Sequence, residues 1–292
     1  MDGNRRAGGR RAPRWGAPAA ILRDGLRPSA AAVRVRSGII LLELYLMWTA
    51  LQVRLLNLIA PGPPTACSGS AYSQKSKLET LLGKGFFEAI TGKTVIDFGC
   101  GEGTDAIEMA QRGASRVIGV DIRDDVLQIA RKRAETAHVE DRCVFCRETH
   151  ERADIIVSLD GFEHFAEPDA VLETLARLLR PSGVVWGSFG PCWYHPLGGH
   201  LFSVFPWAHL LFSESALIRW RSRFKNDGAT RFSEVAGGLN QMTIKRFIRL
   251  VEASPLRFDI LELVPIRKLR YLHNRLTREF TTSVVRFRLI RR

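Results

Sequence analysis

The stretch Val95–Gly103, with the sequence VIDFGCGEG, decides the fold of this chain. An apolar run leads to an acid, Asp97, and then to three glycines within five positions. The apolar run predicts a buried strand, and the following GTDAIEMAQRG, residues 103–113, predicts a helix. A strand that passes through a glycine-rich turn into a helix N-terminus can bind a ligand through its backbone N–H groups.

The segments around this turn alternate between strand and helix patterns. Parallel strands need crossover connections, so the alternation predicts a doubly wound, mostly parallel α/β sheet with helices on both faces. The last strand alternates apolar and polar residues and suits an antiparallel position near a sheet edge. We expect helices at 75–90, 123–137, 168–180 and 243–254, and strands at 116–122, 143–148, 154–160, 183–190, 257–266 and 281–290.

The glycine spacing narrows the class of ligand. Dinucleotide-binding folds use G-x-G-x-x-G, whereas Gly99, Gly101 and Gly103 give G-x-G-x-G. The carboxylate of Asp97 beside the turn would repel a pyrophosphate and attract a cationic amine. Asp121 follows the second strand about twenty residues on, where an acid can accept hydrogen bonds from ribose hydroxyls. A nucleoside joined to a cation indicates S-adenosylmethionine (SAM), and it disfavours a nicotinamide cofactor.

Four segments resemble, in order and spacing, the landmarks of class I SAM-dependent methyltransferases: VIDFGCGEG, GVDI, DIIVSLDGFEHF and RLLRPSGVVWGSFGP. The resemblance covers residues 72–190, with looser similarity in the later helix and strands. It is closest to the small-molecule branch of the family, whose fourth strand ends in Glu-His. It implies a Rossmann-like, seven-stranded sheet with one antiparallel strand, and SAM as co-substrate across the carboxyl ends of the first strands.

The same resemblance assigns roles to individual residues. Asp97 and the glycine turn would line the methionine part of SAM, and Asp121 would hold the ribose. Ile122 would flank the adenine, while Ser158 and Leu159 would face the sulfonium side. The turn residues included in this cofactor-binding set are Gly99, Cys100, Gly101 and Gly103.

Methyl transfer from a sulfonium is an in-line displacement, so the protein mainly has to align the nucleophile and exclude water. A hydroxyl acceptor must also lose a proton, for which His164, His195 and His200 are the candidate bases. Each of them can equally be a structural, hydrogen-bonded histidine, and Glu163 is expected to brace its loop. No metal is expected, because no carboxylate joins His195 and His200 at ligand spacing.

Residues 191–242 interrupt the alternation and are rich in aromatic side chains. We expect this insertion to form an apolar lid over the carboxyl edge, where ligands bind in open α/β sheets. Such a lid favours a small apolar, aromatic or lipid-like acceptor, methylated on oxygen or on carbon. The other interpretation is a plain pair of helices that covers the sheet. The residues expected in the lid are Phe202, Phe205, Trp207, Leu210 and Phe212.

The alternative function is a non-catalytic partner of the same fold that binds the cofactor without methylating. A nucleic-acid substrate is disfavoured, because no N/D-P-P-Y/F tetrad is present to hold a flipped base. The charge distribution agrees with this. Residues 1–37 carry +7 and residues 265–292 carry +8, so the +13 of the whole chain leaves −2 on residues 38–264.

The N-terminal part precedes the catalytic pattern. Residues 1–38 are expected to be a disordered basic tail, and residues 61–71 a Pro-rich linker to a methyltransferase domain at 72–292. Residues 39–60 predict an apolar helix that either contacts a membrane or packs on the protein itself. Five scattered cysteines favour a reducing compartment, so we expect a cytoplasmic protein with membrane association through 39–60.

Overall fold

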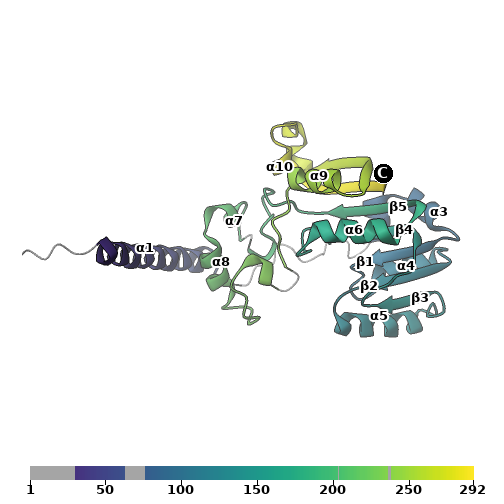
Figure 1. Cartoon of the computed structure of the whole chain (residues 1–292), viewed down its shortest axis with the longest axis horizontal. Coiled ribbons are helices and arrows are strands. Elements are labelled where there is room, and N and C mark those ends of the chain that lie inside the picture. The colour runs from purple at the N-terminus through teal and green to yellow at the C-terminus, as the bar shows by residue number, and fades with distance from the viewer. Residues whose placement is uncertain (1–29, 63–75, 203, 236–237) are drawn as a thin grey trace, which may run out of the picture. The chain divides into compact units, whose positions relative to one another are not determined.

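The computed structural model describes residues 30–62, 76–202, 204–235 and 238–292. The expected tail up to residue 29 and most of the expected linker lie outside these residues. Within them, seven strands form one mixed sheet in the order β3-β2-β1-β4-β5-β7-β6 (Figure 1). The strands are β1 (Thr94–Phe98), β2 (Arg116–Val120), β3 (Cys143–Cys146), β4 (Ala153–Leu159), β5 (Leu179–Phe189), β6 (Leu256–Pro265) and β7 (Thr282–Arg291).

The pairing of the strands confirms the predicted doubly wound sheet. β1 pairs in parallel with β2 on one side and β4 on the other, with Asp97 opposite Gly119 and Val157. β7 runs antiparallel to both β5 and β6, so it lies one strand in from the edge that β6 forms. The carboxyl ends of β1, β2, β4 and β5 therefore meet at one edge of the sheet, as parallel pairing requires.

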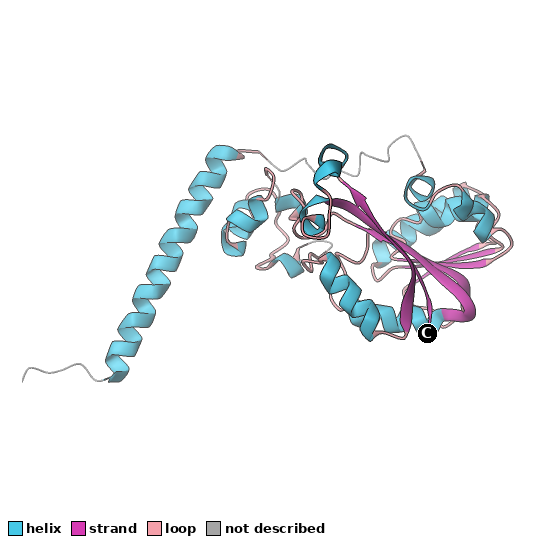
Figure 2. Cartoon of the chain, turned by 90° about the horizontal axis from the view of Figure 1, so that it is seen from above, coloured by secondary structure: helices cyan, strands magenta, loops and turns pink. Residues whose placement is uncertain are grey.

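Helices cover both faces of the sheet (Figure 2). Successive strand residues point to opposite faces, so Val95 packs in one apolar cluster and Ile96 in the other. The first cluster lies beneath α2 (Lys77–Leu82), α3 (Gly85–Ile90), α4 (Thr104–Gln111) and α5 (Asp124–Thr136). The second lies beneath α6 (Pro168–Leu178) and α9 (Ile244–Ala253).

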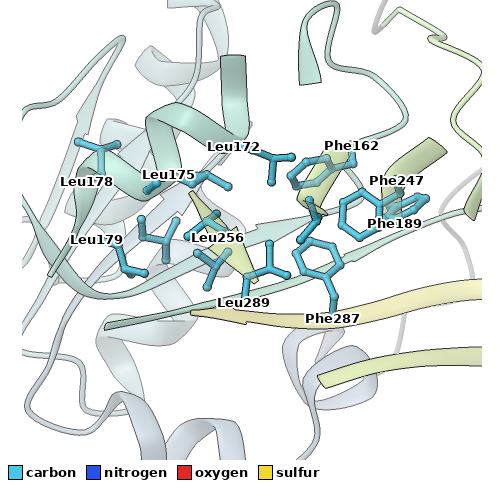
Figure 3. Packing of buried hydrophobic residues seen from close by; sticks show 14 of the residues in the cluster. Phe162, Leu172, Leu175, Leu178, Leu179, Phe189, Phe247, Leu256, Phe287 and Leu289 are labelled. Carbon is cyan, nitrogen blue, oxygen red and sulfur yellow. The ribbon is translucent and has the colours of Figure 1, made fainter. Parts of the chain in front are cut away.

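Four buried phenylalanines hold the second face together at the end nearest the carboxyl edge (Figure 3). Phe247 of α9 has its ring centroid 5.2 Å from that of Phe162 and 4.8 Å from those of Phe189 and Phe287. A Cβ on Gly187 would lie 2.1 Å from the Phe287 ring, so only glycine leaves room for this packing. Because Phe162 directly precedes Glu163 and His164, the cluster fixes the loop that carries these two candidate residues.

Two elements differ from the sequence-based expectation. The helix expected at 75–90 is divided into α2 and α3 at Gly83, whose φ of 83° does not continue a helix. β5 begins at Leu179 rather than near residue 183, since Leu179 already pairs with Ala153. A register shift between Ala153 and Ile155 accommodates the extra residues of β5.

The insertion after β5 has its own apolar core. Its helical elements are η2 (His200–Phe202), α7 (Ala208–Leu211), α8 (Glu214–Arg221) and η3 (Phe232–Glu234). Trp220, Leu217, Phe202 and Phe232 are buried together in this core, and the Phe202 and Phe232 ring centroids are 4.8 Å apart. The insertion is therefore a small packed unit and not only a covering loop.

Helix α1 (Ala30–Ile59) contributes its last turns to the core of the insertion. Leu56 is fully buried there, and the indole N–H of Trp220 donates to the carbonyl of Ala60 at 3.0 Å. Gln52 accepts hydrogen bonds from the backbone N–H and the hydroxyl of Ser213, at 2.8 and 3.0 Å. The helix begins at Ala30, ahead of the boundary at residue 39 that the sequence suggested.

The chain divides into two compact units, residues 1–46 and 47–292, and α1 runs across the boundary. Among the described helices, α1 alone is long and apolar enough to cross a membrane, over Ile39–Ile59, with a mean hydropathy of 1.6. Each described side chain from Ile39 to Trp48 is exposed, and most of these are large and apolar.

Leu56→Ala should loosen the insertion, because it removes a fully buried side chain from the contact between α1 and α8. We expect the free energy of opening of α8 to fall by about 2–5 kcal/mol, measured by hydrogen exchange of its amides. Leu58→Ala is the control, since Leu58 is 81% exposed and should change this value by less than about 0.5 kcal/mol. Equal effects of the two variants would contradict the packing described.

Candidate functional site

The three glycines in the turn between β1 and α4 have two different structural roles. Gly99, Gly101 and Gly103 have φ angles of 85°, 52° and 77°, a region that other residues adopt at a cost. A Cβ on Gly99 would meet nothing within 4 Å, and one on Gly101 only the guanidinium of Arg123 at 3.9 Å. On Gly103 it would lie 2.8 Å from Ala130 and from the Phe145 ring. The first two glycines thus leave open space for a ligand, and the third permits close packing of the helices.

Asp97 presents a buried carboxyl group at this open side. It is 4% exposed, and its Oδ2 has no hydrogen-bond partner among the described residues. Burial, followed by the nearby carboxylate of Asp105, raises the pKa of Asp97 to about 8, although Lys77 opposes the shift. A buried polar atom without a partner is costly, and a ligand cation would relieve that cost.

Lys77 is a part of the site that sequence reasoning missed. Its ammonium group pairs with Asp160 at 3.1 Å and with Asp105 at 3.7 Å. Burial lowers the pKa of Lys77, but these two carboxylates outweigh burial and the net shift is upward. Ser76 caps α2 by accepting from the N–H of Glu79, so the sequence signalled the helix start but not the ion pairs.

Asp121, the residue expected to hold the ribose, lies buried at the end of β2. One carboxylate oxygen accepts from Gly101 N–H at 3.0 Å, and the other accepts from the backbone N–H and Nε of Arg123 at 3.0 and 3.1 Å. Burial raises the pKa of Asp121, but the hydrogen bonds from Arg123 outweigh it and the pKa is lowered. The group is therefore ionised and joined to the glycine turn. Next to it, Ile122 exposes 78% of its surface.

The remaining residues of the expected cofactor set lie at the same edge. Ser158 and Leu159 end β4, and the buried hydroxyl of Ser158 has no partner among the described residues. Cys100 lies under the turn, where its Sγ would be 2.9 Å from a Cβ on Gly119. Its thiol thus contacts the core, and the open side of the turn belongs to the glycines.

The loop after β4 and the insertion bring together Glu163, His164 and His200. One ligand atom from each lies within 4.8 Å of the other two. His164 Nδ1 lies 2.8 Å from the carbonyl of Gly238, and His200 Nδ1 lies 3.0 Å from that of Gly198. Carbonyls only accept, so both Nδ1 atoms carry the hydrogen, and both neutral rings have a bare Nε2.

Glu163 is the third member of this group. It is 2% exposed; its Oε1 accepts from the N–H of Gly190 at 3.1 Å, and its Oε2 has no partner among the described residues. Burial, followed by the charge of Asp160, raises the pKa of Glu163 to about 8. The reason for expecting no metal, the lack of a carboxylate near the histidines, does not hold in the folded chain.

The trio of Glu163, His164 and His200 can act in two ways. A bare imidazole Nε2 can take a proton from an acceptor hydroxyl, with the carboxyl group orienting the ring. A carboxylate and two imidazoles that each donate to a carbonyl are also typical ligands of a divalent transition metal. Proton transfer to the imidazole needs no metal, which agrees with the expectation from the sequence. If the trio instead held a cation, that cation would lower the pKa of the acceptor hydroxyl.

His195, the third candidate base, is placed differently. Its Nδ1 accepts a hydrogen bond from the N–H of Leu197 at 2.9 Å, so the proton of the neutral ring is on Nε2. Burial, followed by His200 and His209, lowers the pKa of His195 to about 4. This geometry is that of a hydrogen-bonded structural histidine.

The residues expected in the lid are divided between two environments. Phe202 is buried in the core of the insertion, where it contacts Phe232 and Arg221. Phe205 and Phe212 are partly buried, with ring centroids 6.1 Å apart, and Trp207 donates to the carbonyl of Tyr194 at 2.9 Å. Phe202 therefore stabilises the insertion, and the other aromatic rings remain candidates to face an acceptor.

The sequence profile of the methyltransferase-domain family matches residues 72–236, more than half of the chain. The chain therefore belongs to the class I SAM-dependent methyltransferases, and the resemblance found in its sequence is confirmed. It is 34% identical over 106 residues to a ubiquinone biosynthesis O-methyltransferase of Neisseria meningitidis serogroup A. It is 36% identical over 107 residues to the protein of that name from Pectobacterium atrosepticum.

These alignments cover 34% and 35% of this chain and 44% of each relative, so the chain matches less than half of their length. Solved structures are similar to this chain at low identity. A SAM-dependent methyltransferase from Mesorhizobium loti has a TM-score of 0.46 at 16% identity, over 71% of this chain and 96% of its own. The cyclase SpnF has a TM-score of 0.49 at 15% identity, over 84% and 94%.

The pKa of Asp97 leads to a prediction for ligand binding. Below about pH 8 the free protein holds a proton on Asp97, whereas a bound cation favours the ionised carboxylate. Binding should therefore release a proton, and the affinity for SAM should rise by up to tenfold per pH unit between about pH 6 and 8, then level off. Calorimetry in buffers of different ionisation enthalpy measures both effects.

The matched control is Asp97→Asn, which keeps the shape of the side chain and cannot ionise. It should bind SAM more weakly, and its affinity should lack the part of the pH dependence that Asp97 causes. The linkage also predicts that the stability of the free protein falls between about pH 4 and 8, because the folded state retains a proton that the unfolded state releases. Identical pH profiles for the two proteins would refute this role for Asp97.

Proposed function

We propose that this protein transfers the methyl group of SAM to a hydroxyl oxygen of a small acceptor with a large apolar part. The observation that carries the proposal is the buried Asp97 carboxyl, whose Oδ2 has no partner among the described residues, next to two glycines that leave open space. A ligand with both a cation and a ribose suits Asp97 and Asp121 together. The names of the O-methyltransferase relatives favour oxygen over carbon as the methylated atom.

The transfer itself needs alignment and one proton acceptor. SAM, when bound, supplies a methyl group on a sulfonium that leaves as a neutral thioether. A hydroxyl of the acceptor would lose its proton to Nε2 of His164 or His200, and its oxygen would form the bond to the methyl carbon. Partly buried rings of the insertion, such as Phe205 and Phe212, would pack on the apolar part and exclude water.

A cofactor-binding partner without activity remains the second candidate. It is favoured by one observation, the burial of Phe202 in the insertion's own core, which removes an aromatic side chain from the expected acceptor pocket. The two candidates differ in whether any acceptor is turned over while SAM is bound.

A methyl-transfer assay separates these candidates. We expect the full chain to transfer isotope-labelled methyl from SAM to catechols, and to favour those that carry an apolar chain. His200→Asn should reduce the rate by about 10²–10⁴-fold, while His195→Asn should leave it within about threefold, because the His195 ring is only hydrogen-bonded. SAM binding without transfer to any phenol would support the non-catalytic candidate.

The same assay with a chelator tests the metal question. If imidazole alone takes the proton, EDTA should leave the rate unchanged, which is what the sequence-based expectation of no metal requires. Loss of activity that Mn²⁺ or Zn²⁺ restores, in the parent chain but not in Glu163→Gln, would show that the trio holds a cation and would contradict that expectation.

We also propose that α1 attaches this protein to the cytoplasmic face of a membrane by lying in one leaflet. Its exposed apolar part, residues 39–48, is about 15 Å long at 1.5 Å per residue, half of the hydrocarbon thickness of about 30 Å. The following turns use Thr49, Gln52 and Leu56 to contact the insertion. A spanning helix would also place the basic residues 1–37 and the catalytic unit on opposite sides.

Cell fractionation tests this attachment. The full chain should sediment with membranes and be released by alkaline carbonate, as expected for an interfacial helix; a spanning helix would need detergent. Deletion of residues 1–46 should make the protein soluble and leave SAM affinity unchanged, because this cut preserves Leu56 and the core of the insertion. A full chain that is soluble without detergent would show that the helix does not bind membranes.

A further inference from the structure

The connector between β6 and β7, Ile266–Thr281, exposes large apolar side chains at four positions. Tyr271 is 85% exposed, Leu272 59%, Leu276 90% and Phe280 43%. The connector consists of η4 (Arg267–Leu272), a turn and the short helix α10 (Arg278–Thr281). Several large apolar side chains exposed on one short segment indicate that this segment contacts an apolar partner or surface.

The connector is also strongly basic. Its five cations form no ion pair with any described residue, and Arg270 lies over the ring of Tyr271 at 4.7 Å. The one acid, Glu279, accepts hydrogen bonds from the N–H groups of Ile244 and Lys245, at 3.0 and 2.8 Å, and so caps α9. The charges thus remain available to an anionic partner. The cations are Arg267, Lys268, Arg270, Arg275 and Arg278.

The exposed side chains are held on a well-bonded scaffold. The N–H of Ile266 donates to the carbonyl of Thr281 at 2.8 Å and closes the connector at its base. His273 and Thr281 form a side-chain hydrogen bond of 2.8 Å, and the N–H of Arg278 donates to the carbonyl of Asn274 at 2.9 Å. The apolar exposure therefore belongs to the folded connector and is not the result of a frayed end.

The connector lies at the same edge of the sheet as the candidate site. Pro265 pairs with Thr282, and Val285 of β7 pairs with Phe189 at the carboxyl end of β5. The Phe280 ring centroid is 5.4 Å from that of Tyr194, at the start of the insertion. A flat partner that contacts the connector would thus lie next to the edge where an acceptor enters.

We propose that this connector docks the catalytic unit on an anionic lipid surface. Leucine and tyrosine side chains beside arginine and lysine are the composition that enters the lipid headgroup region, where the apolar groups reach the acyl boundary and the cations meet acidic headgroups. Nucleic acid would leave Leu272 and Leu276 in water. The inference goes beyond the proposed methyl transfer, and it requires neither SAM binding nor insertion of α1.

Hydrogen exchange of the connector in the full chain tests this docking. The probes are vesicles of phosphatidylcholine alone and vesicles with one part phosphatidylglycerol to two parts phosphatidylcholine. We expect amides of residues 268–280 to exchange roughly tenfold more slowly on the anionic vesicles than on the neutral ones. Because the readout is local, the result does not depend on whether α1 attaches the chain to both kinds of vesicle.

Matched variants give the experiment its controls. Leu272→Ser combined with Leu276→Ser should abolish the slowing, and both side chains are exposed, so the fold should be retained. Ile129→Ser, at a 40% exposed position on α5, should leave it unchanged. The proposal is overturned if anionic vesicles do not slow exchange, if the double variant is still protected, or if only RNA protects the connector. A loss of methyl transfer would not affect this test.

Discussion

The site depends on one constraint, the buried carboxyl group of Asp97, whose Oδ2 has no hydrogen-bond partner among the described residues. Asp97 lies near the end of β1, just before the turn where a Cβ on Gly99 would meet nothing within 4 Å. Lys77 forms ion pairs with the neighbouring acids Asp105 and Asp160. Asp121 accepts a hydrogen bond from the backbone N–H of Gly101 in the turn. A cost of this kind is retained at sites that bind ligands, since the ligand supplies the missing partner.

The parallel sheet explains why distant residues of the sequence meet around that group. β1, β2, β4 and β5 all end at one edge, and the connections that leave this edge carry the glycine turn, Asp121, the Glu163–His164 loop and the insertion. The packing of Phe162 on Phe247 fixes the loop that carries Glu163. The carbonyl of Gly238 accepts a hydrogen bond from His164. The insertion therefore completes the trio through His200.

The sequence predicted the fold well, because the fold depends on local patterns; the cofactor-binding residues were chosen from the same patterns and stay a prediction. Strand periodicity, the glycine spacing and an acid at or near the end of each of two strands are visible without a structure. Contacts between distant segments could not be predicted: Lys77 with Asp160, His200 with Glu163, and Phe202 with Phe232 depend on how the insertion and α2 fold back. The different roles of Gly99 and Gly103 could not be predicted either, because the sequence does not show that Gly103 has close neighbours and Gly99 has none.

The most direct test of the central claim is the calorimetric affinity of the full chain for S-adenosylhomocysteine and for NADH, with Asp121→Ala as the matched variant. We expect the parent chain to bind S-adenosylhomocysteine and not NADH, because an acid next to the glycine turn suits a cationic group better than a pyrophosphate. It also predicts that Asp121→Ala weakens binding by about 1–3 kcal/mol, the cost of leaving ribose hydroxyls unpaired. Binding of NADH in preference, or an unchanged affinity in the variant, would contradict the account.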